Sequence, residues 1–361
     1  MTQRKAILVA THDGTDHPFA ELTDLTRSFG ALVVGQVKRR RDEEDPHTLV
    51  RRGRVEEISM CALTTRADLL IVDRDLSPGQ ARNLEDLTGL AVLDRTQLIL
   101  EIFAQRARSG DGKLQVELAR LRYQLPRLGQ NDGRLSRIGG GTARGGTGST
   151  KGVGETKIER DRRALKRRIA VLTERVVELG ERRREGRKQR RRQELPVVSL
   201  VGYTNAGKST LFNLVTRAGV SAENRLFSTL DPTARRIVLP GGKPVILTDT
   251  VGFIRDLPED LVAAFRATLE ELQDASLLLH VADATDPEVF EHVSQVDGLL
   301  QTLGLHEIPR LLLFNKVDRV IRDEFRPLAE RKGGHLISAR DDREHDRLLD
   351  LIAKHLQMVC A

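Results

Sequence analysis

The sequence contains few residues that could cross-link the chain or anchor it in a membrane. Among 361 residues there are only two cysteines, Cys61 and Cys360, which excludes a framework of disulfides and leaves a structural zinc site without ligands. Tryptophan is absent and aromatic residues make up 3%, so the cores must be built from Leu, Val, Ile and Ala. No apolar run reaches the roughly 18 residues of a membrane-spanning helix, and the first residues do not resemble a cleavable signal. We therefore expect a cytoplasmic protein with reduced thiols.

Positive charge is in excess, and one segment carries the excess. The formal net charge is +7, but residues 155–194 hold 16 basic and 8 acidic residues, so the rest of the chain sums to −1. Eight of the eleven residues from Arg182 to Arg192 are cations. A guanidinium group forms paired hydrogen bonds with phosphate, and this density predicts contact with nucleic acid. The alternative is an ordinary solvated helix face. The residues predicted to contact RNA are Arg187, Lys188, Arg190, Arg191 and Arg192.

The first part of the chain, residues 1–110, is predicted to be a small parallel α/β domain. Short continuous apolar runs alternate there with helical patterns, which is typical of strands buried on both faces of a sheet. Ser77 and Pro78 predict the N-cap and first residue of one of these helices. The predicted strands are residues 6–9, 31–34, 69–72 and 90–93.

The second part, residues 111–195, is predicted to be a long helical hairpin. Apolar residues between Leu165 and Leu179 recur at spacings of four and three, the pattern of a coiled-coil seam. We expect this helix, over 155–194, to pair within the chain with a helix near 113–127. A glycine-rich loop at 139–154 connects them; it is either a flexible linker or a loop that lies against a phosphate backbone.

The third part, residues 196–361, is a second α/β domain and begins with a phosphate-binding motif. A buried-strand pattern at 197–201 is followed at once by G-x-x-x-x-G-K-[ST] and an amphipathic helix. In such a loop, backbone N–H groups and the helix N-terminus bind phosphate. We expect Lys208 to reach the β- and γ-phosphates and the Ser209 hydroxyl to ligate Mg²⁺. The motif comprises Gly202, Tyr203, Thr204, Asn205, Ala206, Gly207, Lys208, Ser209 and Thr210.

A second strand pattern, at 244–247, leads into D-x-x-G, formed by Asp249, Thr250, Val251 and Gly252. We expect Asp249 to hold Mg²⁺ through water and the Gly252 N–H to bind the γ-phosphate. Upstream lies the segment in which a threonine should ligate Mg²⁺ and cap the γ-phosphate; we favour Thr229, with Thr233 as the alternative. This segment comprises Phe227, Ser228, Thr229, Leu230 and Asp231. Lys208, Thr229 and Gly252 are the predicted catalytic residues.

A third strand pattern, at 311–314, ends in N-K-x-D, formed by Asn315, Lys316, Val317 and Asp318. The Asp318 carboxylate can accept two hydrogen bonds from guanine N1 and N2, which adenine cannot supply. A fourth strand pattern, at 334–337, is followed by Ser338, Ala339 and Arg340, where a backbone N–H is expected to reach guanine O6. Four motifs in this order predict a GTP- and GDP-binding domain.

Hydrolysis by this domain alone is expected to be slow. In Ras-type enzymes a glutamine after D-x-x-G orients the attacking water, but Phe253 stands here and has no hydrogen-bonding side chain. The activator is then either a partner outside the domain or K⁺ held by Asn205; the alternative for Asn205 is an ordinary loop amide.

The chain resembles the HflX-type GTPases, a family of ribosome-associated translation factors, over nearly its whole length. The resemblance rests on Leu76–Pro78, Val92–Thr96, Ser136–Arg137 before a triple glycine, Gly154–Glu159, Gly202–Thr210, Thr229–Thr233 and Asp249–Ile254. It implies a Ras-like P-loop GTPase domain, supports Thr229 as a Mg²⁺ ligand, and implies a monomer that binds the 50S subunit and rRNA and separates ribosomes in a GTP-dependent way. The alternatives are an RNA- or ribosome-binding module with GTP as a largely structural ligand, or a ribosome-assembly GTPase.

Overall fold

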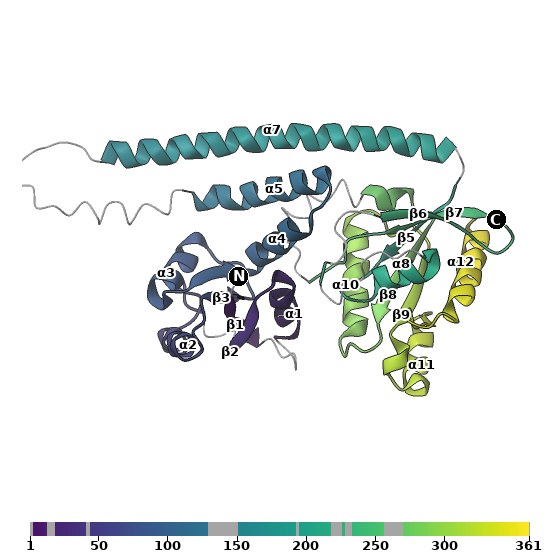
Figure 1. Ribbon diagram of the computed structural model, residues 1–361, viewed down its shortest axis with the longest axis horizontal. Helices are drawn as coiled ribbons and strands as arrows, with labels where there is room; N and C mark the ends of the chain where they lie inside the picture. Colours follow the sequence, from purple (N-terminus) through teal and green to yellow (C-terminus); the bar gives the residue numbers. More distant parts are fainter. Residues whose placement is uncertain are drawn as a thin grey trace, which may run out of the picture. The chain divides into compact units, whose positions relative to one another are not determined.

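The computed structural model describes residues 3–12, 19–40, 44–128, 151–192, 195–217, 226–227, 233–255 and 270–360 (Figure 1). The chain divides into two units, one of Met1–Gln105 with Lys113–Val177 and one of Arg106–Gly112 with Glu178–Ala361. Each unit contains a parallel or largely parallel sheet, so the predicted α/β class is confirmed. None of the helices in these described ranges is both long enough and apolar enough to cross a membrane.

The sheet of the first unit has four parallel strands in the order β2-β1-β3-β4. The four predicted apolar runs form its strands, because continuous apolar sequence suits a sheet covered on both faces. The strands are β1 (Lys5–His12), β2 (Leu32–Arg40), β3 (Leu69–Val72) and β4 (Ala91–Asp94). The helices between and after them are α1 (Ala20–Phe29), α2 (Arg52–Thr65), α3 (Pro78–Thr88) and α4 (Arg95–Arg106).

The start of α3 shows how local sequence fixes an element. The Ser77 Oγ accepts the Gln80 N–H at 3.2 Å, and the Gln80 side chain accepts the Ser77 N–H at 2.9 Å. This capping box satisfies two N–H groups that the first helical turn cannot pair, and Pro78 supplies the helical φ angle. The N-cap predicted at Ser77 is therefore confirmed.

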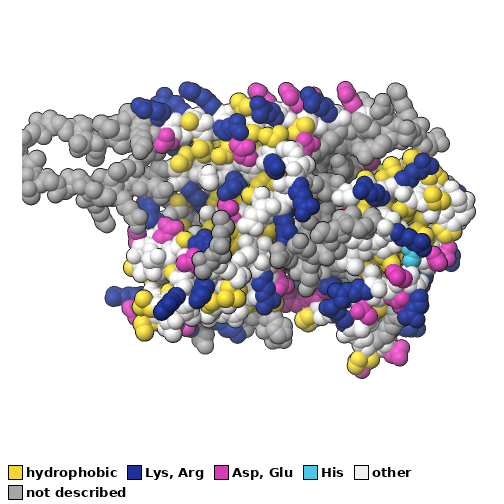
Figure 2. All heavy atoms as spheres, viewed as in Figure 1, with side chains coloured by type: hydrophobic (Ala, Val, Ile, Leu, Met, Phe, Trp, Pro, Cys, Tyr) yellow, Lys and Arg dark blue, Asp and Glu magenta, His cyan; other side chains and the backbone are white. Residues whose placement is uncertain are grey.

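The middle region is helical, with α5 (Gly110–Gln124), the short η2 (Leu125–Arg127) and α7 (Lys151–Arg192). In the first unit, α5 and α7 lie side by side (Figure 1), and Arg168 of α7 pairs with Glu117 of α5 at 2.8 Å. Leu172 of the predicted seam is fully buried, and the other seam residues are half-buried. The helix begins at Lys151, inside the range predicted as loop. Figure 2 shows side chains of both charges along the described part of α7.

The sheet of the second unit has six strands in the order β10-β9-β8-β5-β7-β6, of which only β6 is antiparallel. The strands are β5 (Val197–Val201), β6 (Thr233–Val238), β7 (Pro244–Asp249), β8 (Leu277–Asp283), β9 (Arg310–Asn315) and β10 (His335–Leu336). The helical elements are α8 (Lys208–Thr216), η3 (Glu270–Asp274), α10 (Val289–Thr302), η4 (Val317–Arg319), α11 (Arg322–Arg331) and α12 (Glu344–Cys360).

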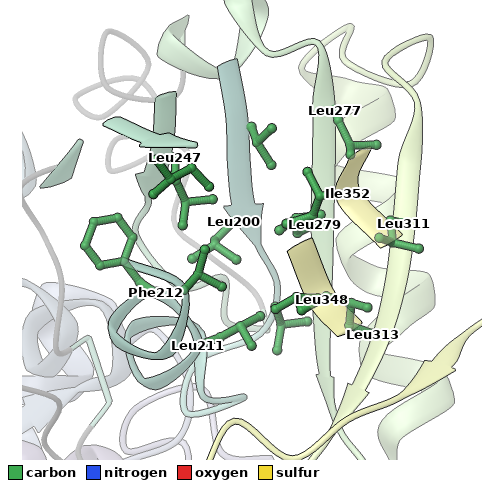
Figure 3. Packing of buried hydrophobic residues seen from close by; sticks show 14 of the residues in the cluster. Leu200, Leu211, Phe212, Leu247, Leu277, Leu279, Leu311, Leu313, Leu348 and Ile352 are labelled. Atoms are coloured by element: carbon green, nitrogen blue, oxygen red, sulfur yellow. The ribbon is translucent and has the colours of Figure 1, made fainter. Parts of the chain in front are cut away.

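One hydrophobic core joins this sheet to α8 and α12 (Figure 3). Leu200 and Leu279 of the strands pack with Phe212 of α8 and with Leu348 and Ile352 of α12, and all five are at most 1% exposed. Strand β5 lies at the centre, with β7 on one side and β8 on the other. The loops after β5, β7 and β9 therefore meet at the carboxyl edge of the sheet, where α/β proteins bind ligands.

Candidate nucleotide-binding site

The loop between β5 and α8 requires glycine at two positions. Gly202 has φ +146°, and a Cβ there would lie 2.1 Å from the Val281 carbonyl oxygen of β8. Gly207 has φ +94°, and a Cβ would lie 2.2 Å from Asn315 Nδ2. Any side chain would push the loop off the neighbouring strand ends. These two glycines fix where α8 begins, with Lys208 as its first residue.

Lys208 lies inside the loop. Its Nζ donates to the carbonyl oxygens of Gly202 at 3.1 Å and Tyr203 at 2.8 Å, and the residue is 6% exposed. Burial lowers the pKa of Lys208 to about 8; the charge of Lys316 also lowers it, whereas the charge of Asp249 acts against the shift. A buried ammonium with so little compensating charge is suited to a polyanion such as a nucleotide phosphate.

Ser209 and Asp249 meet although they are 40 residues apart in sequence. The Ser209 Oγ donates to Asp249 Oδ2 at 2.8 Å, at the end of β7. Thr250 next to it donates to the Leu200 carbonyl at 2.6 Å, which holds the loop after β7 against β5. A hydroxyl and a carboxylate are hard oxygen ligands that suit Mg²⁺. Within the described ranges there is no group of three or more His, Cys, Asp or Glu arranged to hold a metal ion. Among the described residues, the candidate Mg²⁺ ligands are therefore the Ser209 hydroxyl and, through water, the Asp249 carboxylate.

Asn315 connects two loops of the site. Its Nδ2 donates to the Ala206 carbonyl at 2.8 Å, and its Oδ1 accepts the Ala339 N–H at 2.9 Å. The Ala339 N–H, a candidate donor to guanine O6, thus has a partner in the protein, and its contact with the base stays a prediction. The bracing role of Asn315 was not anticipated, because it depends on a contact 109 residues away in sequence.

Asp318 and Lys316 also have partners within the site. Asp318 Oδ1 accepts the Ser338 hydroxyl at 2.7 Å, and this hydrogen bond lowers the pKa of the Asp318 carboxyl. Lys316 has φ +65°, and its Nζ pairs with Asp283 Oδ2 at 2.6 Å. Asp283 ends β8 and was missed; an acidic residue at the end of an apolar run would have been the only sequence signal. Base selection by Asp318 stays a prediction.

The other predicted residues are placed as follows. Phe227 is buried with φ +57°, while Ser228, Thr229, Leu230 and Asp231 lie outside the described residues. The alternative Mg²⁺ ligand, Thr233, lies in β6 opposite Asp249. Val317 is buried in η4, and Arg340 is exposed. The basic residues at 187–192 belong to α7, but their side chains are outside the described residues.

Family comparisons cover most of the chain. Residues 16–104 match "GTP-binding GTPase N-terminal", residues 106–190 match "GTP-binding GTPase Middle Region", and residues 197–316 match "50S ribosome-binding GTPase". GTPase HflX of Caldanaerobacter subterraneus subsp. tengcongensis is 46% identical over 356 residues, covering 98% of this chain and 81% of the relative. GTPase HflX of Escherichia coli is 46% identical over 321 residues, covering 89% and 74%.

Solved structures of GTP-binding proteins share the fold over the whole chain. The crystal structure of SsGBP in complex with GDP is 25% identical, covers 100% of both chains and has a TM-score of 0.57. A GTP-binding protein from the hyperthermophilic archaeon Sulfolobus solfataricus, also in complex with GDP, is 25% identical, covers 99% of this chain and 100% of its own, and has a TM-score of 0.52. The predicted P-loop GTPase domain is thus confirmed, and the chain belongs to the GTPase HflX family of GTP-hydrolysing proteins.

Proposed function

We propose that this GTPase binds the large ribosomal subunit and couples GTP binding and hydrolysis to the separation of ribosomal subunits. The observation that carries the nucleotide part is the meeting of Lys208, the Ser209–Asp249 pair and Asn315 at one edge of the sheet. The ribosomal part is supported by the match of residues 197–316 to a family described as ribosome-binding and by the basic segment of α7.

Within this proposal, each part of the site has a separate task toward GTP. Lys208 supplies positive charge to the β- and γ-phosphates, and the Gly252 N–H donates to the γ-phosphate. Ser209, Thr229 and, through water, Asp249 would hold Mg²⁺, which when bound neutralises charge that develops on the phosphates. Asp318 selects guanine, and Asn315 keeps the base-binding loop in register with the phosphate loop.

In this proposal each of three domains has its own task; the domains are residues 1–110, 111–195 and 196–361. The N-terminal domain and the helical hairpin, with the glycine-rich sequence at 139–154, dock on rRNA, and the GTPase domain binds and hydrolyses GTP. The residues that contact phosphates of rRNA are Arg187, Lys188, Arg190, Arg191 and Arg192, because these five cations are flanked in the sequence by only two carboxylates, Glu185 and Glu194.

This docking surface can be tested with two variants of equal charge change. One replaces these five cations by glutamine; the control replaces Arg235, Arg236, Lys243, Arg331 and Lys332, all of which are exposed in the second unit. Only the first should weaken co-sedimentation with 50S subunits and flatten its salt dependence, with nucleotide affinity unchanged in both. Equal binding of wild type and first variant at every salt concentration would mean that the run is a solvated helix face.

Activation from outside the domain follows from Phe253. Its side chain is 4% exposed and has no group that could orient water. We propose that the ribosome stimulates turnover at least tenfold, about 1.4 kcal/mol of barrier. K⁺ would add to this if Asn205, which has φ +61°, ligates the ion beside the phosphates.

The test is single-turnover GTP hydrolysis in Na⁺ and in K⁺ buffers, each with and without 50S subunits, followed by light scattering of 70S ribosomes with GTP. Faster hydrolysis with 50S and a GTP-dependent loss of scattering support the proposal. A rate in Na⁺ without ribosomes that equals all the others would contradict external activation, and 70S ribosomes that stay intact would contradict subunit separation.

A further inference from the structure

The segment that follows D-x-x-G is hydrogen-bonded to the phosphate loop. The Phe253 N–H donates to the Gly202 carbonyl at 3.0 Å, and the Phe253 carbonyl accepts the Thr204 N–H at 2.7 Å. These two bonds form a parallel β-bridge between Tyr203 and Phe253. Both the N–H and the carbonyl of Phe253 are thus hydrogen-bonded to the predicted phosphate-binding loop.

The side chain of Tyr203 adds a second attachment. Its hydroxyl oxygen accepts the Arg255 N–H at 2.8 Å. Its ring stacks on His292 of α10, with centroids 3.9 Å apart and planes 9° from parallel, and the residue is only 8% exposed. The His292 Nδ1 in turn lies 3.2 Å from Asp286 Oδ2, in the loop after β8. The stack therefore holds the ring in a position from which its hydroxyl accepts the Arg255 N–H.

These contacts bring Gly252 against the group that must bind the γ-phosphate. A Cβ on Gly252 would lie 2.9 Å from Lys208 Nζ and 3.0 Å from Thr204 Cα. Lys208 itself donates to loop carbonyls in this arrangement. A γ-phosphate that contacts both Lys208 Nζ and the Gly252 N–H has to separate these two groups, whereas a nucleotide that ends at the β-phosphate does not.

We propose that Tyr203 is a residue that determines the preference between GDP and GTP. Held by His292, it keeps residues 252–255, here called the latch segment, on the phosphate loop. GDP binds with these contacts intact, and GTP binds only after they break. The contacts therefore lower the affinity for GTP and leave the affinity for GDP unchanged. This inference needs only GTP and GDP binding and does not depend on a ribosomal role.

The test is the ratio of the dissociation constants of fluorescently labelled GDP and of the labelled β,γ-imido analogue of GTP. Tyr203→Phe removes the hydroxyl that accepts the Arg255 N–H and keeps the stacked ring. Loss of one neutral hydrogen bond changes an equilibrium roughly two- to tenfold, so the preference for GDP should fall by about that factor, through tighter binding of the GTP analogue. Thr302→Val is the matched control, because it removes a hydroxyl bonded to the Gly298 carbonyl at the exposed end of α10; its ratio should equal that of wild type.

Two changes at His292 test the stack separately. His292→Leu removes the aromatic partner and should shift the ratio in the same direction as Tyr203→Phe, whereas His292→Phe keeps an aromatic ring and should restore the wild-type ratio. An unchanged ratio in both Tyr203→Phe and His292→Leu would overturn the proposal. Equal losses of affinity for both nucleotides would also overturn it, because they would show a structural role without nucleotide preference. If one variant does not fold, the other decides the question.

Discussion

The buried ammonium of Lys208 predicts that nucleotide binding takes up a proton. In the structure, burial lowers its pKa from 10.5 to about 8. Each pKa unit corresponds to about 1.4 kcal/mol, so the charged form is disfavoured by roughly 3 kcal/mol relative to water. Phosphate oxygens placed beside Nζ favour the charged form, and the pKa of the bound state rises accordingly.

The magnitude follows from the titration of the unliganded site. With a pKa of about 8, half of the Lys208 amines are neutral at pH 8 and about one in ten at pH 7. Binding of GDP should then take up about 0.5 proton at pH 8 and about 0.1 at pH 7. The affinity for GDP should be constant well below pH 8 and should fall as the pH rises through 8, because a neutral Lys208 in the unliganded site must take up a proton when GDP binds.

Isothermal titration calorimetry of GDP binding in two buffers of different ionisation enthalpy measures this uptake directly. Lys208→Arg keeps a cation that never becomes neutral in this range and should take up no proton, whereas Lys332→Arg, at an exposed position, should behave as wild type. No proton uptake by the wild type at pH 8 would refute the reasoning and would mean that the lysine is already charged in the unliganded site.

Three further predictions concern base recognition, the core of the second unit and the contacts of η2 with the sheet of the first unit. Asp318→Asn should reverse the hydrogen-bond pattern toward the base, so competition titrations should show lost affinity for GDP and gained affinity for xanthosine diphosphate; an unchanged preference for guanine would contradict base selection. Burial, together with Arg310 and Lys208, lowers the pKa of His280 to about 3, so the ring is neutral despite Asp297 at 3.7 Å. Below pH 6.5 the His280 side chain therefore binds a proton in the unfolded chain but not in the folded one, and the free energy of unfolding should fall by up to about 1.4 kcal/mol per pH unit as the pH drops from 6.5 toward 3. Urea unfolding of His280→Gln should show a weaker dependence of stability on pH. An equal slope for this variant and the wild type would exclude His280 as the source of the pH dependence. In the first unit, Arg127 donates to buried Asp94 at 2.8 Å and lies 3.5 Å over the Tyr123 ring, so Arg127→Met should cost about 2 kcal/mol of unfolding free energy. A loss below about 0.5 kcal/mol would show that the Tyr123 hydroxyl and the N–H groups of Leu76 and Gln97 satisfy the carboxylate without Arg127.

The strands that could be predicted from sequence are those with continuous apolar runs, such as β1, β3 and β5. Strand β6 could not, because it is an edge strand on which Arg235 and Arg236 are exposed and no apolar run marks it. Strand β8 has a clear apolar run, but none of the nucleotide-binding motifs follows it. The motifs themselves were informative because their requirements are local: the glycines at 202 and 207 are needed by the shape of one loop.

The contacts that organise the site are not local, and this limits what sequence can predict. Asn315 reaches Ala206, and Tyr203 stacks on His292, only because the sheet order places β5 beside β8 and β8 beside β9. Neither contact has a spacing in the sequence that would suggest it. The identity of a motif residue can therefore be predicted, whereas its partner requires the topology.

The position of Phe253 links the slow hydrolysis that we expect to the nucleotide preference that we propose. A water-orienting glutamine would have to present its amide beside the γ-phosphate, but here the residue after D-x-x-G is buried, and both its N–H and its carbonyl are bonded to the phosphate loop. The contacts that keep residue 253 away from the reacting phosphate are the same contacts that GTP must break to enter. A partner that draws the latch segment off the loop would then increase the affinity for GTP and free the segment for catalysis in one movement. If the ribosome is the activator, as proposed above, we expect it to act on the latch segment, and Tyr203→Phe should have the same effect on affinity without supplying the groups that accelerate hydrolysis.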